Sequence, residues 1–199
     1  MAVKKEDLKK LQMPETYKEL GIQTRWAAKK SAGDKLIAFP FYDSRDVQKV
    51  LDHVCGPANW TNEPLNINGK TYMNLGINIE GEGWVYKSDV GTESKEDSVK
   101  GEASDALKRA ASMWGIFRHK YDTDQIFLNT ITKNGKKVPC TSNGKPLYGK
   151  QVTDYCNRIN TGMGNLMSVY KENEQAFKEH PEALENLSAL KEFLNGLKQ

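Results

Sequence analysis

Two adjacent cations, Lys108 and Arg109, lie within segment 100–115, whose apolar residues recur at helical spacing. An amphipathic helix buries such a stripe against a core and leaves the flanking side chains at its edge. The stripe consists of Ala103, Leu107, Ala110 and Trp114. Paired cations beside a tightly packed stripe suit a ligand with a phosphate backbone. The alternative is a solvated helix face on which Asp105 pairs with Arg109 across one turn.

Two other short motifs imitate sites for nucleotides or metals. Gly69-Lys70-Thr71 resembles the end of a P-loop, but Pro64 stands where the first glycine belongs, and the segment opens a strand. His119, Asp122 and Asp124 could ligate the metal of a nuclease, although no second acidic cluster has recognisable spacing. The ordinary alternative is a helix end with basic residues that complement the helix dipole. We therefore expect no catalytic residues, no metal and no cofactor.

The elements before the cationic helix are a strand and a helix. Residues 35–42 form a short apolar run that predicts the strand. Asp43 or Ser44 then caps a helix that ends at Gly56-Pro57. Its predicted core face consists of Val47, Val50, Leu51 and Val54. Cys55 is expected as a buried thiol at the end of this helix.

Residues 59–90 predict a three-stranded antiparallel meander. Asn68-Gly69 between two alternating runs is a strong hairpin signal, and the acidic Gly-rich turn 80–83 leads into the third strand. The second strand alternates apolar with polar residues, so one face is apolar. The cationic helix, expected from about Glu93 to Phe117, can cover that face. This order of elements predicts an α+β fold with a β-β-β-α core.

The chain divides by pattern into four segments. Residues 1–34 are expected to be helical to about residue 30, and residues 35–122 form the core. Residues 123–150 are a basic segment with hairpin turns at Asn134-Gly135 and Asn143-Gly144, and residues 151–199 are helical. Gly162 and Gly164 interrupt this last segment, and Pro181 begins a final helix that packs or binds a partner.

Composition restricts the class of protein. No apolar run approaches the roughly 20 residues of a membrane helix, and the N-terminus has no signal-peptide core. Three scattered cysteines favour a reducing compartment, so we expect a cytoplasmic protein. The net charge of +3 is small, but residues 1–30 and 118–150 are basic whereas residues 80–105 are acidic. Such blocks can bind nucleic acid or pair with the opposite block of a neighbouring copy.

Five motifs in order resemble the Rad52 family of single-strand annealing proteins, especially its phage and bacterial members. They are Phe41-Tyr-Asp-Ser-Arg-Asp-Val47, Gly56-Pro-Ala-Asn-Trp60, Asp89-Val-Gly91, Lys100-Gly-Glu-Ala-Ser-Asp-Ala-Leu-Lys-Arg-Ala110 and Trp114-Gly-Ile116. The likeness covers about residues 35–122. It implies annealing of single-stranded DNA without ATP, by a homo-oligomeric ring or arc in recombination or repair. A single-strand DNA-binding protein is a further implied partner, and a membrane is not.

The resemblance also implies site residues. Arg45, Lys108 and Arg109 would bind phosphates, and Lys100 would extend this row. Tyr72 and Tyr86 are proposed to stack on bases. Core packing is the favoured role of Trp84 and Trp114, because large aromatic side chains are usually well buried.

Three positions depart from the family pattern. Ser112 replaces a frequent third cation, Phe117 replaces a frequent glycine, and the 80–83 turn is acidic, which argues against a second basic DNA site there. Two other functions remain open: a non-annealing scaffold that binds a partner through residues 181–197, and a metal-dependent nuclease that uses Asp122 and Asp124.

Overall fold

A computed structural model describes most of the chain, namely residues 2–92, 98–123, 125–160 and 174–179. It divides into two compact units, Met1–Thr153 and Asp154–Gln199. Within the described residues, no helix has the length and apolar character needed to span a bilayer. The α+β fold class is confirmed.

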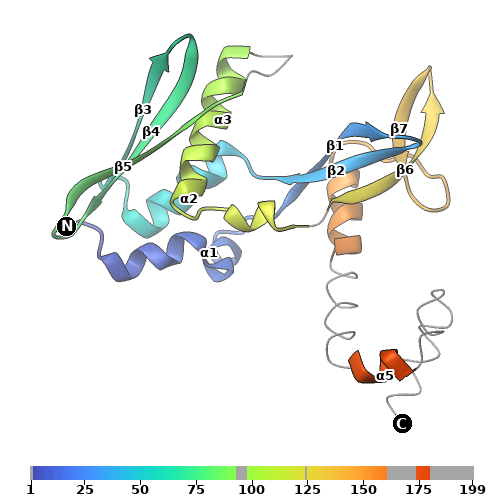
Figure 1. The fold of residues 1–199 in the computed structure, drawn as a ribbon, viewed down its shortest axis with the longest axis horizontal. Helices are drawn as coiled ribbons and strands as arrows, with labels where there is room; N and C mark the ends of the chain where they lie inside the picture. Colours follow the sequence, from blue (N-terminus) through green and yellow to red (C-terminus); the bar gives the residue numbers. More distant parts are fainter. Residues whose placement is uncertain (1, 93–97, 124, 161–173, 180–199) are drawn as a thin grey trace. The chain divides into compact units, whose positions relative to one another are not determined.

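The predicted meander is present as a three-stranded antiparallel sheet (Figure 1). It consists of β3 (Trp60–Ile67), β4 (Lys70–Ile79) and β5 (Gly83–Val90). Asn68 and Gly69 join β3 to β4 with φ angles of 52° and 73°, which is the backbone that the Asn-Gly signal predicts. The alternation in β4 buries Met73, Leu75, Ile77 and Ile79.

The helix that covers this apolar face is α3 (Ser98–Met113), which contacts both β4 and β5. Leu107 and Ala110 of the predicted stripe are buried, and Ala106 and Ala111 are buried beside them. The helix ends at Met113 rather than at Phe117. Gly115 adopts a φ of 96°, and the N–H groups of Gly115 and Ile116 bind the carbonyls of Ser112 and Ala111. This Schellman arrangement stops the helix. Glu93, the predicted start, lies outside the described residues.

Helix α2 (Ser44–Cys55) packs beside α3 and forms as predicted. The Asp43 side chain accepts the N–H of Arg45, and Asp46 binds back to the N–H of Asp43, which completes a capping box. Val47, Val50 and Leu51 are buried in one core with β4 and α3. The Cys55 thiol is also buried, which raises its pKa to about 12.

The N-terminal segment corrects one expectation. Two short helices, η1 (Lys5–Gln12) and α1 (Pro14–Glu19), form within the segment that was expected to be helical. Helix was also expected to about residue 30, but Arg25–Ala32 forms strand β1. Pairing with the next strand decides this, since an apolar partner strand outweighs the weak local preference of the sequence.

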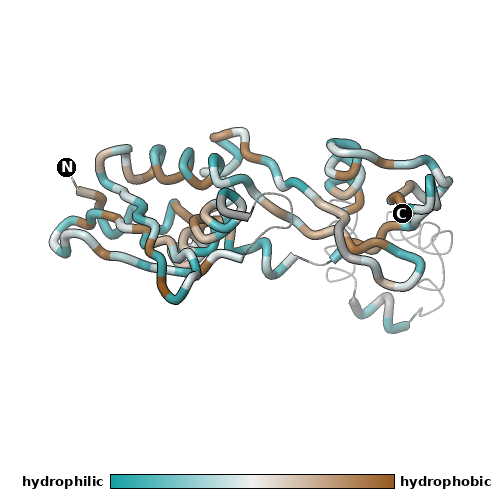
Figure 2. Tube along the Cα trace, turned by 90° about the horizontal axis from the view of Figure 1, so that it is seen from above, coloured by the Kyte–Doolittle hydropathy of each residue, from teal (hydrophilic) through white to brown (hydrophobic). Residues whose placement is uncertain are grey.

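A second antiparallel sheet has the order β1-β2-β6-β7. Its other strands are β2 (Lys35–Phe41), β6 (Ile126–Lys133) and β7 (Lys136–Cys140). Asn134 and Gly135 form the hairpin turn between β6 and β7, as predicted. Figure 2 shows how hydrophilic and hydrophobic residues alternate along the elements of the chain.

The C-terminal segment is described only in part. Residues 150–160 are helical, and α5 (Glu174–Glu179) is a single short helix. Gly162, Gly164 and the predicted helix after Pro181 lie outside the described residues.

Candidate nucleic-acid interface

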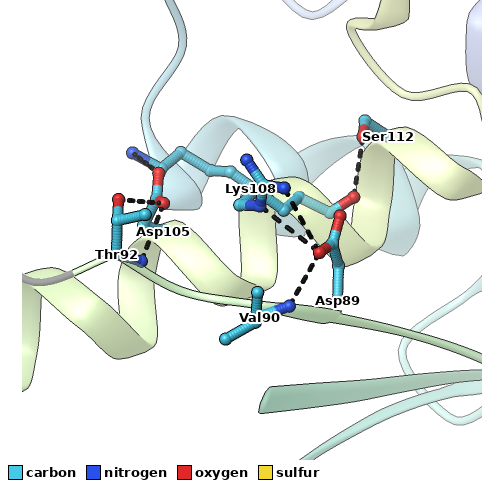
Figure 3. Close-up of polar contacts among 7 residues, drawn as sticks. Asp89, Val90, Thr92, Asp105, Lys108 and Ser112 are labelled. Atoms are coloured by element: carbon cyan, nitrogen blue, oxygen red, sulfur yellow. Dashed lines mark hydrogen bonds and ion pairs between the residues drawn. The ribbon is translucent and has the colours of Figure 1, made fainter. Parts of the chain in front are cut away.

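Lys108 and Arg109 of α3 lie along the line of contact between this helix and β5, which we call the β5–α3 seam (Figure 3). Its polar members are Lys87, Asp89, Thr92, Asp105, Lys108 and Arg109. Lys87 and Asp89 point toward α3 because residues two apart in a strand share one face. The seam therefore brings charged groups of a strand and a helix into one row.

Arg109 is held by Asp89. The Nε and Nη2 atoms of Arg109 each lie 3.4 Å from Oδ1 of Asp89. The same oxygen accepts the N–H of Val90 at 2.7 Å, which fixes the carboxylate (Figure 3). Nε is buried and makes no hydrogen bond, whereas 39% of the Arg109 side chain is exposed. Arg109 is thus anchored on one side and open on the other.

Lys108 is partnered by the acid one turn before it. Its Nζ lies 3.8 Å from Oδ1 of Asp105, and 26% of its side chain is exposed. Asp105 also accepts hydrogen bonds from the N–H and hydroxyl groups of Thr92 at 3.2 and 2.8 Å. The alternative pairing of Asp105 with Arg109 does not occur, because Asp89 reaches Arg109 from the strand.

Two further cations meet at the C-terminal end of α3, and neither was predicted from the sequence to bind phosphate. Nζ of Lys87 donates to the carbonyl of Met113 at 2.9 Å, and Nη2 of Arg118 donates to the same oxygen at 3.0 Å. Nε of Arg118 donates to the carbonyl of Ser112 at 3.0 Å. The sequence does contain a signal for Lys87, because this residue precedes Asp89 by two positions and therefore lies on the same face of β5.

Close backbone contact at Gly91 positions the seam. A Cβ at Gly91 would lie 2.1 Å from the backbone oxygen of Glu102, so only glycine permits this approach. The Glu102 side chain is buried and accepts the N–H of Thr71 at 2.9 Å. The end of β5 and the start of β4 are therefore both attached to the first half of α3.

The other predicted phosphate ligands lie apart from the Lys108–Arg109 pair. Lys100 is exposed on α3, two helical turns before Lys108. Arg45 is exposed in the first turn of α2 and forms no ion pair with any described residue. Both acids that cap α2 are instead bound by Arg25, which lies 3.3 Å from Asp43 and 3.1 Å from Asp46. The N–H of Arg45 and the charge of Arg25 lower the pKa of Asp43.

Comparisons with known proteins assign the chain to a family. A family model described as Rad52/22 family double-strand break repair protein matches residues 9–138. The chain belongs to this family. It is also 38% identical, over 87 residues, to the single-stranded DNA-binding protein DdrA of Deinococcus deserti. That match covers 40% of this chain and 40% of DdrA. No solved structure matches the chain significantly.

In this Rad52/22 family member, the two predicted stacking residues lie on the face of the meander opposite α3. Tyr86 pairs with Gly76 and lies across it, so a Cβ at Gly76 would come within 2.5 Å of the Tyr86 ring. Tyr72 lies on the same face of β4, since it is separated from Gly76 by four residues. The structure therefore does not bring Tyr72 or Tyr86 together with Lys108 and Arg109.

Trp84 corrects a second expectation. It was assigned to the core, but it is 43% exposed, and its ring lies 6.3 Å from that of Tyr86. Alternation along β5 places Trp84 with Tyr86, away from α3. Trp114 packs against the core as expected, and its Nε1 donates to the carbonyl of Leu75 at 3.1 Å.

Phe117 is the departure from the family pattern with the clearest structural consequence. It adopts a φ of 53°, a conformation that favours glycine. Its ring stacks on Tyr42 with 3.9 Å between centroids and 6° between planes, and its N–H donates to the Tyr17 hydroxyl at 3.0 Å. These contacts hold a bulky residue in an unfavourable backbone region and attach the end of α3 to the residue before the α2 cap.

His119 and Asp122, the described residues considered for a metal, belong to no group of side chains that could hold one. Nε2 of His119 lies 2.8 Å from the hydroxyl of Tyr42, and burial lowers the pKa of His119. Asp124 lies outside the described residues. Among the described part of the chain, no three His, Cys, Asp or Glu side chains are placed to share a metal ion.

Proposed function

We propose that this protein binds single-stranded DNA and anneals complementary strands without ATP, in homologous recombination and DNA repair. The observation that carries the proposal is the β5–α3 seam, where Lys108 and Arg109 lie side by side and remain partly open to solvent. The family of the chain and the name of its relative DdrA point in the same direction. Lys100 and Arg45 would extend the row of phosphate ligands.

Phosphate contacts fit the chemistry of annealing. They fix a strand in place without reading its sequence, so base edges remain free to pair with a complementary strand. Lys108 and Arg109 each have a carboxylate partner that fixes the position of the cation. Because the pairs lie near the surface, opening one of them for a phosphate costs at most about 1 kcal/mol.

We further propose that the protein acts as a homo-oligomeric ring or arc in the cytoplasm. A few cationic contacts in each copy become strong binding when many copies hold one strand, because the later contacts form within the same complex. The three free cysteines, all of them buried, agree with a reducing compartment. A separate single-strand DNA-binding protein would supply coated strands as substrate.

The decisive experiment is annealing of two complementary dye-labelled oligonucleotides without nucleotide. Wild type should anneal them faster than protein-free DNA, and the Lys108→Ala/Arg109→Ala variant should lose most of this activity. The variant should also show a shallower dependence of binding on salt, by about 1.4 in the log–log slope, since each single-strand phosphate contact contributes about 0.7.

A matched control is the adjacent pair Lys9 and Lys10, in which Lys10 pairs with Asp7 at 2.7 Å just as Lys108 pairs with Asp105. The Lys9→Ala/Lys10→Ala variant should anneal like wild type. Annealing by wild type no faster than the spontaneous rate would reject the proposal. In that case a partner-binding scaffold becomes the better function, and cleavage of DNA with added magnesium would instead indicate a nuclease.

A further inference from the structure

We infer that Lys87 and Arg118 form a second phosphate-binding subsite at the C-terminal end of α3. Its ligand would be a backbone phosphate of the same DNA strand that Lys108 and Arg109 contact. The inference rests on the proposed function and names residues that neither the resemblance nor the comparisons assign. It depends on the position of the two cations, on the lack of an acidic partner among the described residues and on their accessibility.

The two cations are held close together by one acceptor. Nζ of Lys87 and Nη2 of Arg118 both lie within 3.0 Å of the Met113 carbonyl oxygen. The ammonium of Lys87 is also 4.4 Å from the centre of the Trp114 ring. A cation–π contact and a shared carbonyl fix the position of this charge without neutralising it.

No described carboxylate lies within ion-pair distance of Lys87 or Arg118, in contrast to the carboxylate partners of Lys108 and Arg109. Burial lowers the pKa of the Lys87 ammonium, and the positive charge of Arg118 lowers it further. An anion that binds between two cations held at a fixed separation offsets their mutual repulsion and so lowers the electrostatic energy. Arginine can offer two parallel N–H groups to phosphate oxygens while lysine adds a point charge.

The subsite is accessible and follows the Lys108–Arg109 pair along α3. Arg118 and the neighbouring Met113 are exposed, and Lys87 is half-buried. Met113 is one helical turn after Arg109, so the subsite continues the seam. On its other side, Phe117 directly precedes Arg118 and stacks on Tyr42, three residues before Arg45. A strand bound by Lys108 and Arg109 that continues past the C-terminal end of α3 would meet Lys87 and Arg118.

The structural alternative is that both cations serve only to cap α3, since cations stabilise helix C-termini. Capping predicts a loss of stability on mutation without a change in salt dependence. Phosphate binding predicts a change in the salt slope that persists in a folded variant. These two consequences can be measured separately.

The test is the salt dependence of binding to an oligothymidine for wild type and for Lys87→Met/Arg118→Gln. The methionine keeps an apolar stem over Trp114, and the glutamine keeps an N–H donor for the helix carbonyls. The log–log slope should become shallower by about 1.4, the value for two single-strand phosphate contacts. Lys87→Arg/Arg118→Lys should keep the wild-type slope, because both charges remain.

Lys137→Met is a matched control, since the Lys137 ammonium is exposed and also donates to a backbone carbonyl, that of Gly33. A wild-type slope in Lys87→Met/Arg118→Gln, with folding confirmed by thermal unfolding, would overturn the inference. So would a loss of half this size in Lys137→Met, which removes one charge where the double variant removes two, because net charge alone would then explain the effect. If wild type itself fails to bind the oligonucleotide, the proposed function and this inference both fall. If Lys108→Ala/Arg109→Ala reduces the salt slope and Lys87→Met/Arg118→Gln does not, only the inference is overturned.

Discussion

Arg109 of α3 and Asp89 of β5 form an ion pair in which one carboxylate oxygen lies 3.4 Å from two nitrogens of the guanidinium. The pair crosses the β5–α3 seam and joins the helix that carries the proposed phosphate ligands to the edge of the meander. It therefore has two possible effects on binding: it orients the arginine, and it competes with an incoming phosphate.

Replacing Asp89 by asparagine separates these effects. The amide oxygen would still accept the N–H of Val90 but would not neutralise Arg109, so we expect Asp89→Asn to bind single-stranded DNA more tightly. The free energy of unfolding should fall by at most about 1 kcal/mol, because the pair is partly exposed. Binding isotherms and denaturant unfolding measure the two quantities. Glu82→Gln is the control for net charge, since Glu82 lies in the β4–β5 turn and pairs there with Lys5 of η1. Weaker binding by Asp89→Asn would show that orientation outweighs competition.

The exposed aromatic face of the meander gives a prediction about base stacking. If bases stack on Tyr86 and Tyr72, Tyr86→Ala should weaken DNA binding by about 1–3 kcal/mol without changing the salt slope. Binding should also quench the fluorescence of Trp84, whose ring lies 6.3 Å from that of Tyr86. Tyr72→Phe keeps an aromatic ring and is the matched control, with affinity close to that of wild type. A change in oligomer size with unaltered affinity per copy would assign this face to assembly instead.

Two glycines of the meander should respond differently to alanine. At Gly91 the added Cβ meets the backbone of Glu102, which cannot move without shifting α3. At Gly76 it meets the ring of Tyr86, which can turn away toward solvent. We expect Gly91→Ala to lower the free energy of unfolding by more than the 1–3 kcal/mol typical of overpacking, and Gly76→Ala by less, about 1 kcal/mol. Denaturant unfolding of both variants tests the order, and equal losses would contradict it.

Tyr17 gives a prediction about alkaline pH. Burial raises its pKa from 10.0 to about 12, and its hydroxyl donates to the carbonyl of Leu11 at 2.6 Å. The unfolded chain therefore loses this proton at lower pH than the folded chain. The resulting contribution to stability is complete below about pH 10 and is lost progressively as the pH rises toward about 12.

The measurement is the free energy of unfolding as a function of pH for wild type and Tyr17→Phe. The variant should be less stable at neutral pH by about 1–3 kcal/mol, because the N–H of Phe117 and the carbonyl of Leu11 lose their partner. Its stability should also decline less steeply above about pH 10. Parallel curves for the two proteins would mean that the Tyr17 hydroxyl does not titrate in this range.

The local sequence was sufficient to predict much of this fold. The Asn68-Gly69 turn, the alternation in β4 and the cap at Asp43 all act within a few residues, so pattern alone determines them. Lys108 and Arg109 were likewise found from the sequence, because a helical stripe fixes which side chains flank it.

Tertiary structure decided whatever depends on partners distant in the chain. Arg25–Ala32 became a strand because β2 lies beside it, and Trp84 is exposed because α3 covers only the other face of the meander. The pairing of Arg109 with Asp89, and the meeting of Lys87 with Arg118, depend on how β5 and α3 pack. Side chains 20 or more residues apart meet only after the elements pack, so periodicity along the chain cannot predict these contacts.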